Sequence, residues 1–531
     1  MHVVVGDWPR INAERQLDSL AVIDATRRLS WEQLDARVNA LCHVVLGLPG
    51  HSVGRRVGIL ADNCSEHLEL MFAASRARFI HTGLNTRHTV VEMANQLADG
   101  QVDVLLVGPE YVETALELRA QRPGLLLIGL AGADLERSYE DLLAQAGSTP
   151  VPAHGDAEEV YSLVYTSGST GEPKGVMVSS RNERAYGQSV AWTVELRHAD
   201  CVLNVAPLFH RGGQFFSMMC AQYGTPLVLM KAFDPDQMLT AMQREEVSLI
   251  LVVPTMLKVL VEHLEKSESD RYDLSSLRLI MCGSAPLSSE LTNRLLNIVT
   301  TDLCQCAGMS EGAFTMSLTS GDYRAIRRDP SLEHRIASVG RVVPGFRVGI
   351  VDEDDNFVPD GVAGELVYQG DAFVQGYWGR PEASARAWRN GWFHSGDVGR
   401  RDADGYIYYI DRLFGRIKTG AETVYSREVE QIFEGHPEIA EVAVVGMPDE
   451  HWGEAVTAAV VLAARDDGAS DLAALEDRLR SFAENAGLSR YKLPKRYSFV
   501  DALPRTSTGK VAYAQVKDLV ASAAAPVPSD S

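Results

Sequence analysis

A loop rich in hydroxyls and glycines is the strongest chemical signal in this sequence. It follows an apolar stretch, residues 160–164, and holds four Ser or Thr hydroxyls, three glycines and a lysine within eleven residues. Glycines let backbone N–H groups approach a ligand, hydroxyls donate hydrogen bonds, and a lysine supplies a point charge. The composition predicts a loop that wraps a polyphosphate, although Pro173 distinguishes it from a Walker loop. In chain order the loop is Tyr165, Thr166, Ser167, Gly168, Ser169, Thr170, Gly171, Glu172, Pro173, Lys174 and Gly175.

Six further segments carry side chains that suit nucleotide chemistry. They are residues 207–210, 283–287, 307–311, 391–397, 411–412 and 504–510. Together with the loop, and in the same order, they closely resemble the signature of adenylate-forming enzymes. This superfamily contains acyl- and aryl-CoA ligases, peptide-synthetase adenylation domains and luciferases. The resemblance covers essentially the whole chain. Each segment is only moderately specific by itself, whereas all six in order are very specific.

The resemblance implies a role for individual residues of these motifs. Glu311 would hold the Mg²⁺ that bridges the phosphates of ATP, and a hard carboxylate suits that ion. Asp397 would accept both ribose hydroxyls, and Arg412 would reach ribose or phosphate. Lys510 would bridge the attacking carboxylate and the nucleotide, and His210 would lie beside the substrate. The other residues implied to bind ATP are Thr166, Ser167, Gly168, Ser169, Thr170, Gly171, Lys174, Gly283, Ser284, Ala285, Ala307, Gly308, Met309 and Ser310.

A substrate pocket is expected from position along the same motifs. Its mixture of aromatic and polar side chains favours an aromatic or medium acyl acid over a long chain. Arg211 has two readings: it pairs with an acidic group of the substrate, or it forms a salt bridge elsewhere in the protein. The pocket candidates are Trp192, Phe209, His210, Arg211, Gln214, Phe215, Gly283 and Met309.

The leading hypothesis is an AMP-forming acid–CoA ligase that uses ATP, Mg²⁺ and coenzyme A. An oxyanion of the acid attacks the α-phosphorus, pyrophosphate leaves, and the acyl group then passes to CoA; the protein chiefly positions anions and neutralises charge. Four departures from the family pattern keep a non-CoA acceptor open. Ala307 replaces a Tyr that stacks on adenine, while Phe414, Ala421 and Thr423 lie in the segment that serves thioester formation.

Three alternatives therefore remain beside the leading hypothesis. One is an ATP-dependent diazotase that activates nitrite and transfers it to an aromatic amine. Another is a ligase that hands the acyl group to a carrier protein or to oxygen. A catalytically idle binding module is disfavoured, because Lys174, Glu311, Asp397 and Lys510 are all present.

These motifs need a scaffold, and the hydrophobic pattern predicts an α/β fold. Apolar stretches at residues 57–60 and 102–107 alternate with helical patterns such as residues 65–77, for which Ser65 is the expected cap. Strands expected at 249–253 and 277–282 end at Pro254 and Gly283, where α/β folds place ligands. We expect helix-covered parallel sheets with a β-barrel-like subdomain from about residue 345.

The domain organisation follows from the change in pattern along the chain. Residues 1–410 are expected to form the N-terminal adenylation domain. Residues 411–520 are expected to form a small mobile α+β domain, with helices at 428–434 and 472–486 and strands at 442–445 and 456–462. The Ala/Pro/Ser-rich residues 521–531 are expected to be a disordered tail. A homodimer is expected by analogy with the family.

Composition narrows the possible partners and compartment. Fifty Lys and Arg residues against 71 Asp and Glu residues give a net charge of −21, which argues against nucleic acid and anionic membranes. Neither a signal peptide nor a membrane span is expected, so the expected compartment is the cytoplasm. Seven scattered cysteines do not predict a disulfide framework. For Cys304 and Cys306, two small residues in a strand or turn are favoured over a redox or metal pair.

Overall fold

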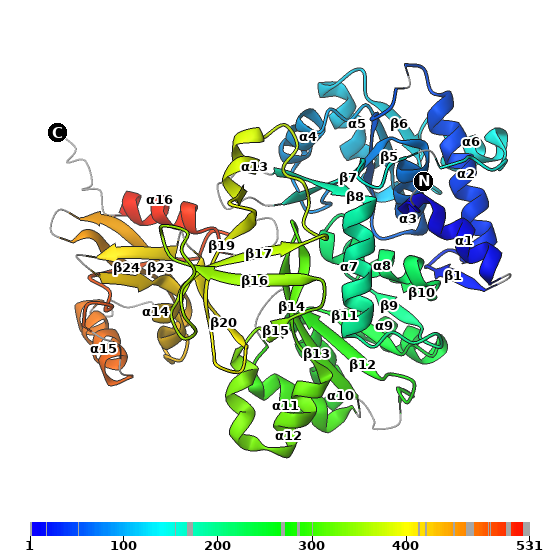
Figure 1. Ribbon diagram of the computed structural model, residues 1–531. Coiled ribbons are helices and arrows are strands. Elements are labelled where there is room, and N and C mark those ends of the chain that lie inside the picture. Colours follow the sequence, from blue (N-terminus) through cyan, green and yellow to red (C-terminus); the bar gives the residue numbers. More distant parts are fainter. Residues whose placement is uncertain are drawn as a thin grey trace, which may run out of the picture.

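A computed structural model gives the fold of this chain. The structure describes residues 3–16, 19–50, 52–153, 155–166, 174–266, 271–283, 287–299, 301–412, 415–419, 422–449, 452–463, 472–486, 488, 490–505 and 511–523. These residues form four sheets with helices packed against them (Figure 1). None of the helices in these ranges combines the length and the apolar character that a membrane span requires.

The first sheet has six strands, and five of them are parallel, as expected from the alternating pattern. The sixth strand returns antiparallel to the fifth. Because the strands are buried on both faces, they are continuous apolar runs. In spatial order the strands are β6 (Leu126–Gly129), β5 (Val104–Val107), β3 (Arg56–Leu60), β4 (Ile80–Gly83), β7 (Val160–Thr166) and β8 (Lys174–Ser179).

The second sheet has nine strands with a parallel centre and antiparallel edges. The expected strands at residues 249–253 and 277–282 are present within two residues at either end. In spatial order the strands are β15 (Arg341–Val342), β14 (Ala313–Leu318), β13 (Asp302–Met309), β12 (Leu279–Gly283), β11 (Leu249–Val252), β9 (Val202–Asn204), β10 (Leu227–Leu229), β1 (Leu20–Ile23) and β2 (Arg28–Ser30).

Helices cover both sheets, and two of them join the sheets through one apolar core. Helix α7 (Ser180–Thr193) contacts β8 and β14, while α8 (Arg211–Tyr223) contacts β9 and β14. The core includes Val104 of the first sheet, Val202 of the second and Phe216 of α8. The other helices of this part are α1 (Trp8–Arg15), α2 (Trp31–Gly47), α3 (Ser65–Ala77), α4 (Val90–Asp99), α5 (Val112–Gln121), α6 (Tyr139–Ala146), α9 (Pro235–Arg244), α10 (Pro254–Lys266), α11 (Ser289–Ile298), α12 (Ser320–Arg328) and α13 (Pro381–Ala387).

Helix α3 has the expected bounds, but the expected serine cap is wrong. Cys64 occupies the N-cap position and its side chain makes no capping bond. The backbone N–H of Ser65 instead donates to Asp24 Oδ2 at 2.9 Å. The carboxylate comes from the residue just after β1, so a tertiary contact replaces the local cap.

The third sheet corresponds to the segment expected to be barrel-like. It is a five-stranded antiparallel sheet in which β18 and β20 both pair with β19, and the described strands do not close into a ring. Its strands are β16 (Phe346–Val351), β17 (Gly364–Gly370), β18 (Trp388–Arg389), β19 (Trp392–Arg401) and β20 (Ile407–Arg412). Strand β20 continues two residues past the expected domain boundary at residue 410.

The C-terminal part is the α+β unit that the sequence predicts, and it has its own apolar core. The final helix extends three residues into the expected disordered tail, and residues 524–531 lie outside the described ranges. The strands are β21 (Arg416–Thr419), β22 (Glu422–Tyr425), β23 (Ile439–Asp449), β24 (Gly453–Leu462) and β25 (Arg496–Phe499). The helices are α14 (Ser426–Phe433), α15 (Leu472–Asn485) and α16 (Tyr513–Ala523).

A buried asparagine links the two large sheets where a motif loop passes between them. Asn63 follows β3 and is 8% exposed. Its Nδ2 donates to the carbonyl oxygens of Ala206 and Met230, both at 3.1 Å, and its Oδ1 accepts from Leu208 N at 2.8 Å. The side chain therefore fixes the loop at residues 206–210 against the first sheet.

We predict that Asn63→Ala lowers the thermal transition temperature by about 2–4 °C, since three buried hydrogen bonds are worth about 2–3 kcal/mol. Differential scanning calorimetry measures this change. Asn297→Ala is the control, because Asn297 is exposed on α11. An equal effect of the two substitutions would contradict the role of Asn63.

Candidate functional site

The hydroxyl- and glycine-rich loop is closed by a hairpin. Thr166 at the end of β7 lies opposite Lys174 at the start of β8 in the antiparallel ladder. The seven residues between them, 167–173, lie outside the described ranges, so the predicted contacts of Ser167, Gly168, Ser169, Thr170 and Gly171 stay predictions. The hairpin places both ends of the loop at one edge of the first sheet.

The motif that contains Glu311 forms the tight turn between β13 and β14. Met309 pairs with Ala313, so Glu311 lies in the connection between them. Gly312 is required there, because a Cβ atom would lie 2.3 Å from the ring of Phe373. The turn therefore presents Glu311 at the carboxyl end of a parallel strand, where α/β folds place ligands.

The motif that begins at Gly283 lies beside the Glu311 motif. Strands β12 and β13 are parallel neighbours, and Gly283 pairs with Cys306. A Cβ on Gly283 would lie 2.4 Å from Cys306 Sγ, so the two strands need a glycine at this point. Ser284 and Ala285 lie outside the described ranges.

Tyr377 joins Lys174 to Glu311, and sequence reasoning missed it. Lys174 Nζ lies 5.2 Å from the centroid of the Tyr377 ring. The Tyr377 hydroxyl donates a hydrogen bond of 2.7 Å to Glu311 Oε1. A cation over an aromatic face and a charge-assisted hydrogen bond both stabilise this arrangement. The available signal was an aromatic pair directly after Gly376, outside every motif used for the prediction.

Backbone hydrogen bonds hold Tyr377 in place. The Met177 N–H donates to the Gly376 carbonyl at 3.1 Å, and the Trp378 N–H donates to Gly175 at 2.8 Å. The Val374 N–H donates to the Glu311 carbonyl at 2.8 Å. Residues 374–378 thus connect β8 to the β13–β14 turn, so the positions of Lys174, Tyr377 and Glu311 depend on one segment.

The surroundings of Glu311 fit the predicted Mg²⁺. Glu311 is half-buried, and only its Oε1 accepts a hydrogen bond from the residues that the structure describes. Mg²⁺ is usually held by one or two carboxylates together with substrate phosphates. Glu311 Oε2 is the atom that would bind the ion, and Lys174 would neutralise charge on the phosphates.

The predicted ribose-binding segment lies within strand β19 of the third sheet, where a bulge between His394 and Val398 makes a local turn of the backbone, called the Asp397 turn below. Gly396 has φ +71°, which a glycine adopts without strain. The Asp397 N–H donates to Ser395 Oγ at 3.0 Å, and the Tyr409 hydroxyl donates to Asp397 Oδ1 at 3.3 Å. Asp397 lies opposite Arg412 in the β19–β20 ladder, so the structure brings these two predicted residues together.

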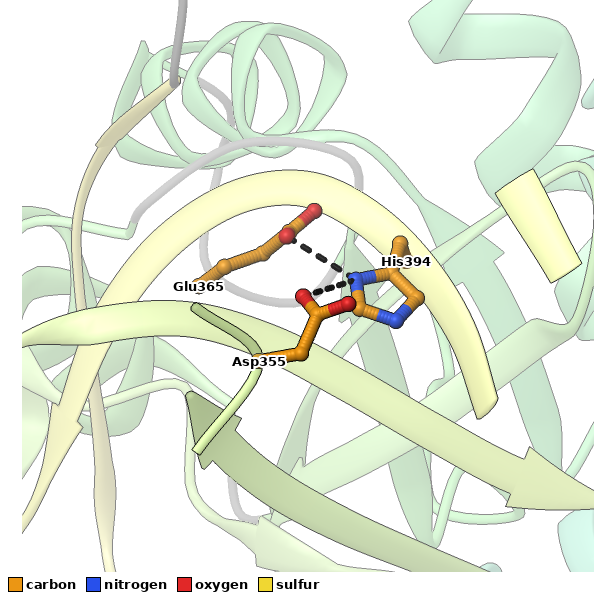
Figure 2. Close-up of side chains that lie close together, drawn as sticks. All are labelled: Asp355, Glu365 and His394. Carbon is orange, nitrogen blue, oxygen red and sulfur yellow. Dashed lines mark hydrogen bonds and ion pairs between the residues drawn. The ribbon is translucent and has the colours of Figure 1, made fainter. Parts of the chain in front are cut away.

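A cluster of charged residues supports this turn (Figure 2). His394 Nδ1 lies 3.0 Å from Glu365 Oε2 and 3.8 Å from Asp355 Oδ1. Glu365 Oε1 accepts a 3.0 Å hydrogen bond from the Gly396 N–H. The three side chains have metal-ligand types, but Arg389 donates to both carboxylates at 2.9 and 3.3 Å. Because Arg389 already hydrogen-bonds to both carboxylates, we interpret the cluster as a support for the Asp397 turn.

The predicted substrate residues divide into a buried group and one exception. Phe209, Arg211, Gln214 and Phe215 are buried, and the rings of Phe209 and His210 lie edge to face at 4.6 Å. Trp192 is 65% exposed at the end of α7, so we remove it from the predicted pocket. The position of Trp192 in the helical repeat puts its side chain on the solvent-exposed face of α7. Its aromatic character alone could not indicate this.

The structure resolves the two readings of Arg211 in favour of a partner within the protein. Its guanidinium forms an ion pair with Glu183 of α7, which sequence reasoning missed. Burial of two opposite charges between α7 and α8 needs the tertiary contact of those helices, which the sequence does not reveal.

The Cys304 and Cys306 pair lies in strand β13, as the simpler interpretation predicts. Both cysteines are free. Burial raises the pKa of the Cys304 thiol to about 12 and raises that of Cys306 well above its usual value. Neutral thiols of this kind are poor nucleophiles and poor metal ligands.

Several predicted residues cannot be placed. The side chain of Arg412 is not among those described, and neither Lys510 nor the altered positions Phe414 and Ala421 fall in the described ranges. Their roles stay predictions.

Comparison with known proteins identifies relatives over nearly the whole length. A family model described as AMP-binding enzyme matches residues 10–378, and the AMP-binding enzyme C-terminal domain model matches residues 428–510. A feruloyl-CoA synthase from an Amycolatopsis species is 35% identical over 520 residues, which cover 97% of this chain and 98% of that protein.

Two solved structures share the fold over the same extent. The o-succinylbenzoate CoA synthetase MenE of Bacillus subtilis, in complex with the acyl-adenylate intermediate, has a TM-score of 0.82 and 25% identity, covering 96% of this chain and 98% of its own. The amide bond synthetase McbA of Marinactinospora thermotolerans has a TM-score of 0.81 and 29% identity, covering 97% and 99%.

We predict that Tyr377→Phe lowers kcat/KM for ATP–pyrophosphate exchange by about tenfold and raises the Mg²⁺ concentration for half-maximal rate. The variant loses one hydrogen bond to a charged carboxylate but keeps the ring beneath Lys174. Mg²⁺ titration of the exchange rate measures the effect. Tyr223→Phe is the control, since Tyr223 lies partly exposed at the end of α8. Unchanged Mg²⁺ dependence in Tyr377→Phe would contradict this role.

We predict that Glu365→Ala raises the KM for ATP by about fivefold to thirtyfold and changes the KM for the acid much less. The Gly396 N–H loses its acceptor, at a cost of about 1–2 kcal/mol, and the Asp397 turn loosens. Glu365→Gln keeps an acceptor and should restore most of the affinity, whereas Asp360→Ala, an exposed change, serves as the control. A folded Glu365→Ala variant with normal KM for ATP would remove the positioning role.

Proposed function

We propose, because this chain belongs to the AMP-binding enzyme family, that it is an AMP-forming ligase that activates a carboxylic acid with ATP and transfers the acyl group to coenzyme A. The observation that carries this proposal is the arrangement of Lys174, Tyr377 and Glu311 at adjoining strand ends. It supplies one cation for phosphate and one carboxylate for Mg²⁺ beside the hairpin loop. A further carboxylate, Asp397, lies in the turn that the family motif assigns to ribose.

Adenylation needs this set of residues for physical reasons. A carboxylate oxygen of the acid attacks the α-phosphorus, and the bond to pyrophosphate breaks. Negative charge accumulates on the phosphoryl oxygens and on the leaving group, so positioned cations lower the barrier. Lys174 neutralises phosphate charge, Glu311 holds the metal ion, and Lys510 is proposed to bridge the attacking carboxylate and the nucleotide.

An aryl acid is the proposed substrate class. The feruloyl-CoA synthase and the o-succinylbenzoate CoA synthetase are named for acids that contain an aromatic ring, and both align along nearly the whole chain. The buried rings of Phe209 and Phe215 beside His210 supply the apolar walls that an aromatic ring needs.

Coenzyme A is the proposed acceptor, with amines as the competing outcome. One structural relative is an amide bond synthetase, so members of this fold pass acyl groups to nitrogen as well. Position 421, where a methyl group is expected to narrow the pantetheine tunnel, lies outside the described ranges. Identification of the reaction products therefore distinguishes coenzyme A from an amine as the acceptor.

We further propose that the C-terminal part moves between the two half-reactions. Strand β20 belongs to the third sheet through Arg412, where it pairs with Asp397. The backbone change is thus expected directly after Arg412, two residues later than the expected domain boundary.

The test offers the purified protein ATP and Mg²⁺ with aryl or acyl acids plus coenzyme A and an amine, and separately with nitrite plus aromatic amines. We expect AMP, pyrophosphate and an aryl-CoA thioester by mass spectrometry. Lys510→Ala should lower pyrophosphate release by about 10²- to 10³-fold, whereas Lys517→Ala in α16 serves as the matched control. A diazo product from nitrite, or amides without any thioester, would overturn the CoA ligase assignment.

A further inference from the structure

A buried polar cluster lies between α7 and α8, apart from the Lys174–Glu311 arrangement. Glu183 and Arg211 are 1% and 4% exposed, and Arg211 Nη1 is paired with Glu183 Oε1. The Tyr161 hydroxyl donates to the same carboxylate oxygen at 3.0 Å. The Arg211 guanidinium lies 5.8 Å from the centroid of the Tyr186 ring. The ion pair is thus buried, and two tyrosine side chains lie against it.

Three of the five polar side-chain atoms of this pair have no hydrogen-bond partner among the described residues. Among the residues that the structure describes, none hydrogen-bonds to Glu183 Oε2 or to Arg211 Nε and Nη2, although all three atoms are buried. Gln214 Oε1, one turn along α8, and His81 Nε2 are buried and unpartnered in the same way. Unsatisfied buried groups are destabilising, and charged ones most of all, so a group that the chain itself does not supply would relieve them.

Two other buried charged side chains, Arg76 and Glu69, are fully hydrogen-bonded, in contrast to this pair. Arg76 is 2% exposed, and its three nitrogens donate to Gly6, Asn39 and Asp35. Glu69 is fully buried, and its two oxygens accept from Arg37 and Tyr139, both at 2.7 Å. The fold therefore can satisfy a buried charge completely, and it leaves the Glu183–Arg211 pair open.

The cluster adjoins the predicted substrate residues. Arg211 is the first residue of α8 and directly follows His210. The ring of Phe215 meets the Tyr186 ring edge-on at 4.6 Å. Phe215 of the predicted pocket and Arg211 of the ion pair thus both lie against the ring of Tyr186.

Resting on the function proposed above, we propose that Glu183 and Arg211 are specificity-determining residues that bind a hydroxyl group carried by the aryl acid. The hydroxyl would donate its proton to Glu183 Oε2 and accept from the Nε or Nη2 of Arg211. A hydroxyl both donates and accepts, so one such group can satisfy both ions at once.

The charge balance favours a neutral hydroxyl over a second carboxylate. Glu183 already neutralises Arg211. Burial lowers the pKa of His81 to about 3, so this neighbour is uncharged at neutral pH. A second carboxylate would bring an unpaired negative charge into a buried site, which is strongly unfavourable.

The test compares benzoate with the hydroxybenzoates and the benzenedicarboxylates, and cinnamate with the hydroxycinnamates, in ATP–pyrophosphate exchange. We expect the wild type to prefer the best hydroxylated acid by about 10- to 100-fold in kcat/KM. The double variant Glu183→Leu/Arg211→Met should adenylate the unsubstituted acid and retain a preference below about threefold. Removing both ions leaves neither charge buried without a partner, so this variant is expected to fold. Glu69→Leu/Arg37→Met is the matched control and should keep the full preference.

A binding measurement separates this proposal from the proposed function. Without ATP, the hydroxylated acid should raise the thermal transition temperature of the wild type more than the unsubstituted acid does, and should lose this advantage in the double variant. If no acid is adenylated, the ligase assignment fails, while this difference in binding still supports the hydroxyl site. Equal use and equal binding of the paired acids, an unchanged preference in the double variant, or a stronger preference for aryl dicarboxylic acids would each overturn the hydroxyl site.

Discussion

The hydrogen-bonded segment at residues 374–378 is the constraint on which the nucleotide site depends. It belongs to the long connection between β17 and α13, yet it pairs with β8 on one side and with the β13–β14 turn on the other. Backbone hydrogen bonds fix distances better than long flexible side chains do. Lys174 and Glu311, which come from different sheets, therefore reach a common partner in Tyr377. This segment connects the two sheets at the point where both contribute to one site.

Polar groups buried between the sheets serve two distinct purposes. Asn63 and Arg76 are saturated with hydrogen bonds, so they join parts of the chain that hydrophobic packing alone would leave free to slide. The Glu183–Arg211 pair is also buried, but three of its polar atoms have no hydrogen-bond partner among the described residues. A buried ion pair contributes little net stability even when it is complete. An incomplete one is better explained by selectivity toward a ligand than by stability of the fold.

The third sheet couples the ribose-binding turn to the start of the C-terminal part. Glu365 and His394 (Figure 2) hold the turn from one side, and the Tyr409 hydroxyl contacts Asp397 from the neighbouring strand. Arg412 closes the same ladder. Because the predicted ribose-binding residue Asp397 pairs with Arg412, the last residue of β20, nucleotide binding and the placement of the C-terminal part are expected to influence each other.

The sequence by itself determined the fold class, the strand ends and the order of the motifs. Apolar period and the positions of Gly283 and Pro254 are local properties, and they predicted strands β11 and β12 to within two residues. It also predicted that Glu311 and Asp397 belong to a nucleotide site, since their neighbours form recognisable motifs. The tertiary structure alone decided which side chains meet. Tyr377 lies 66 residues from Glu311, Glu183 lies 28 residues from Arg211, and Asp24 caps a helix 41 residues away. Such contacts depend on how sheets and helices pack. The packing of α7 likewise decides that the Trp192 side chain lies on the surface and not in a pocket.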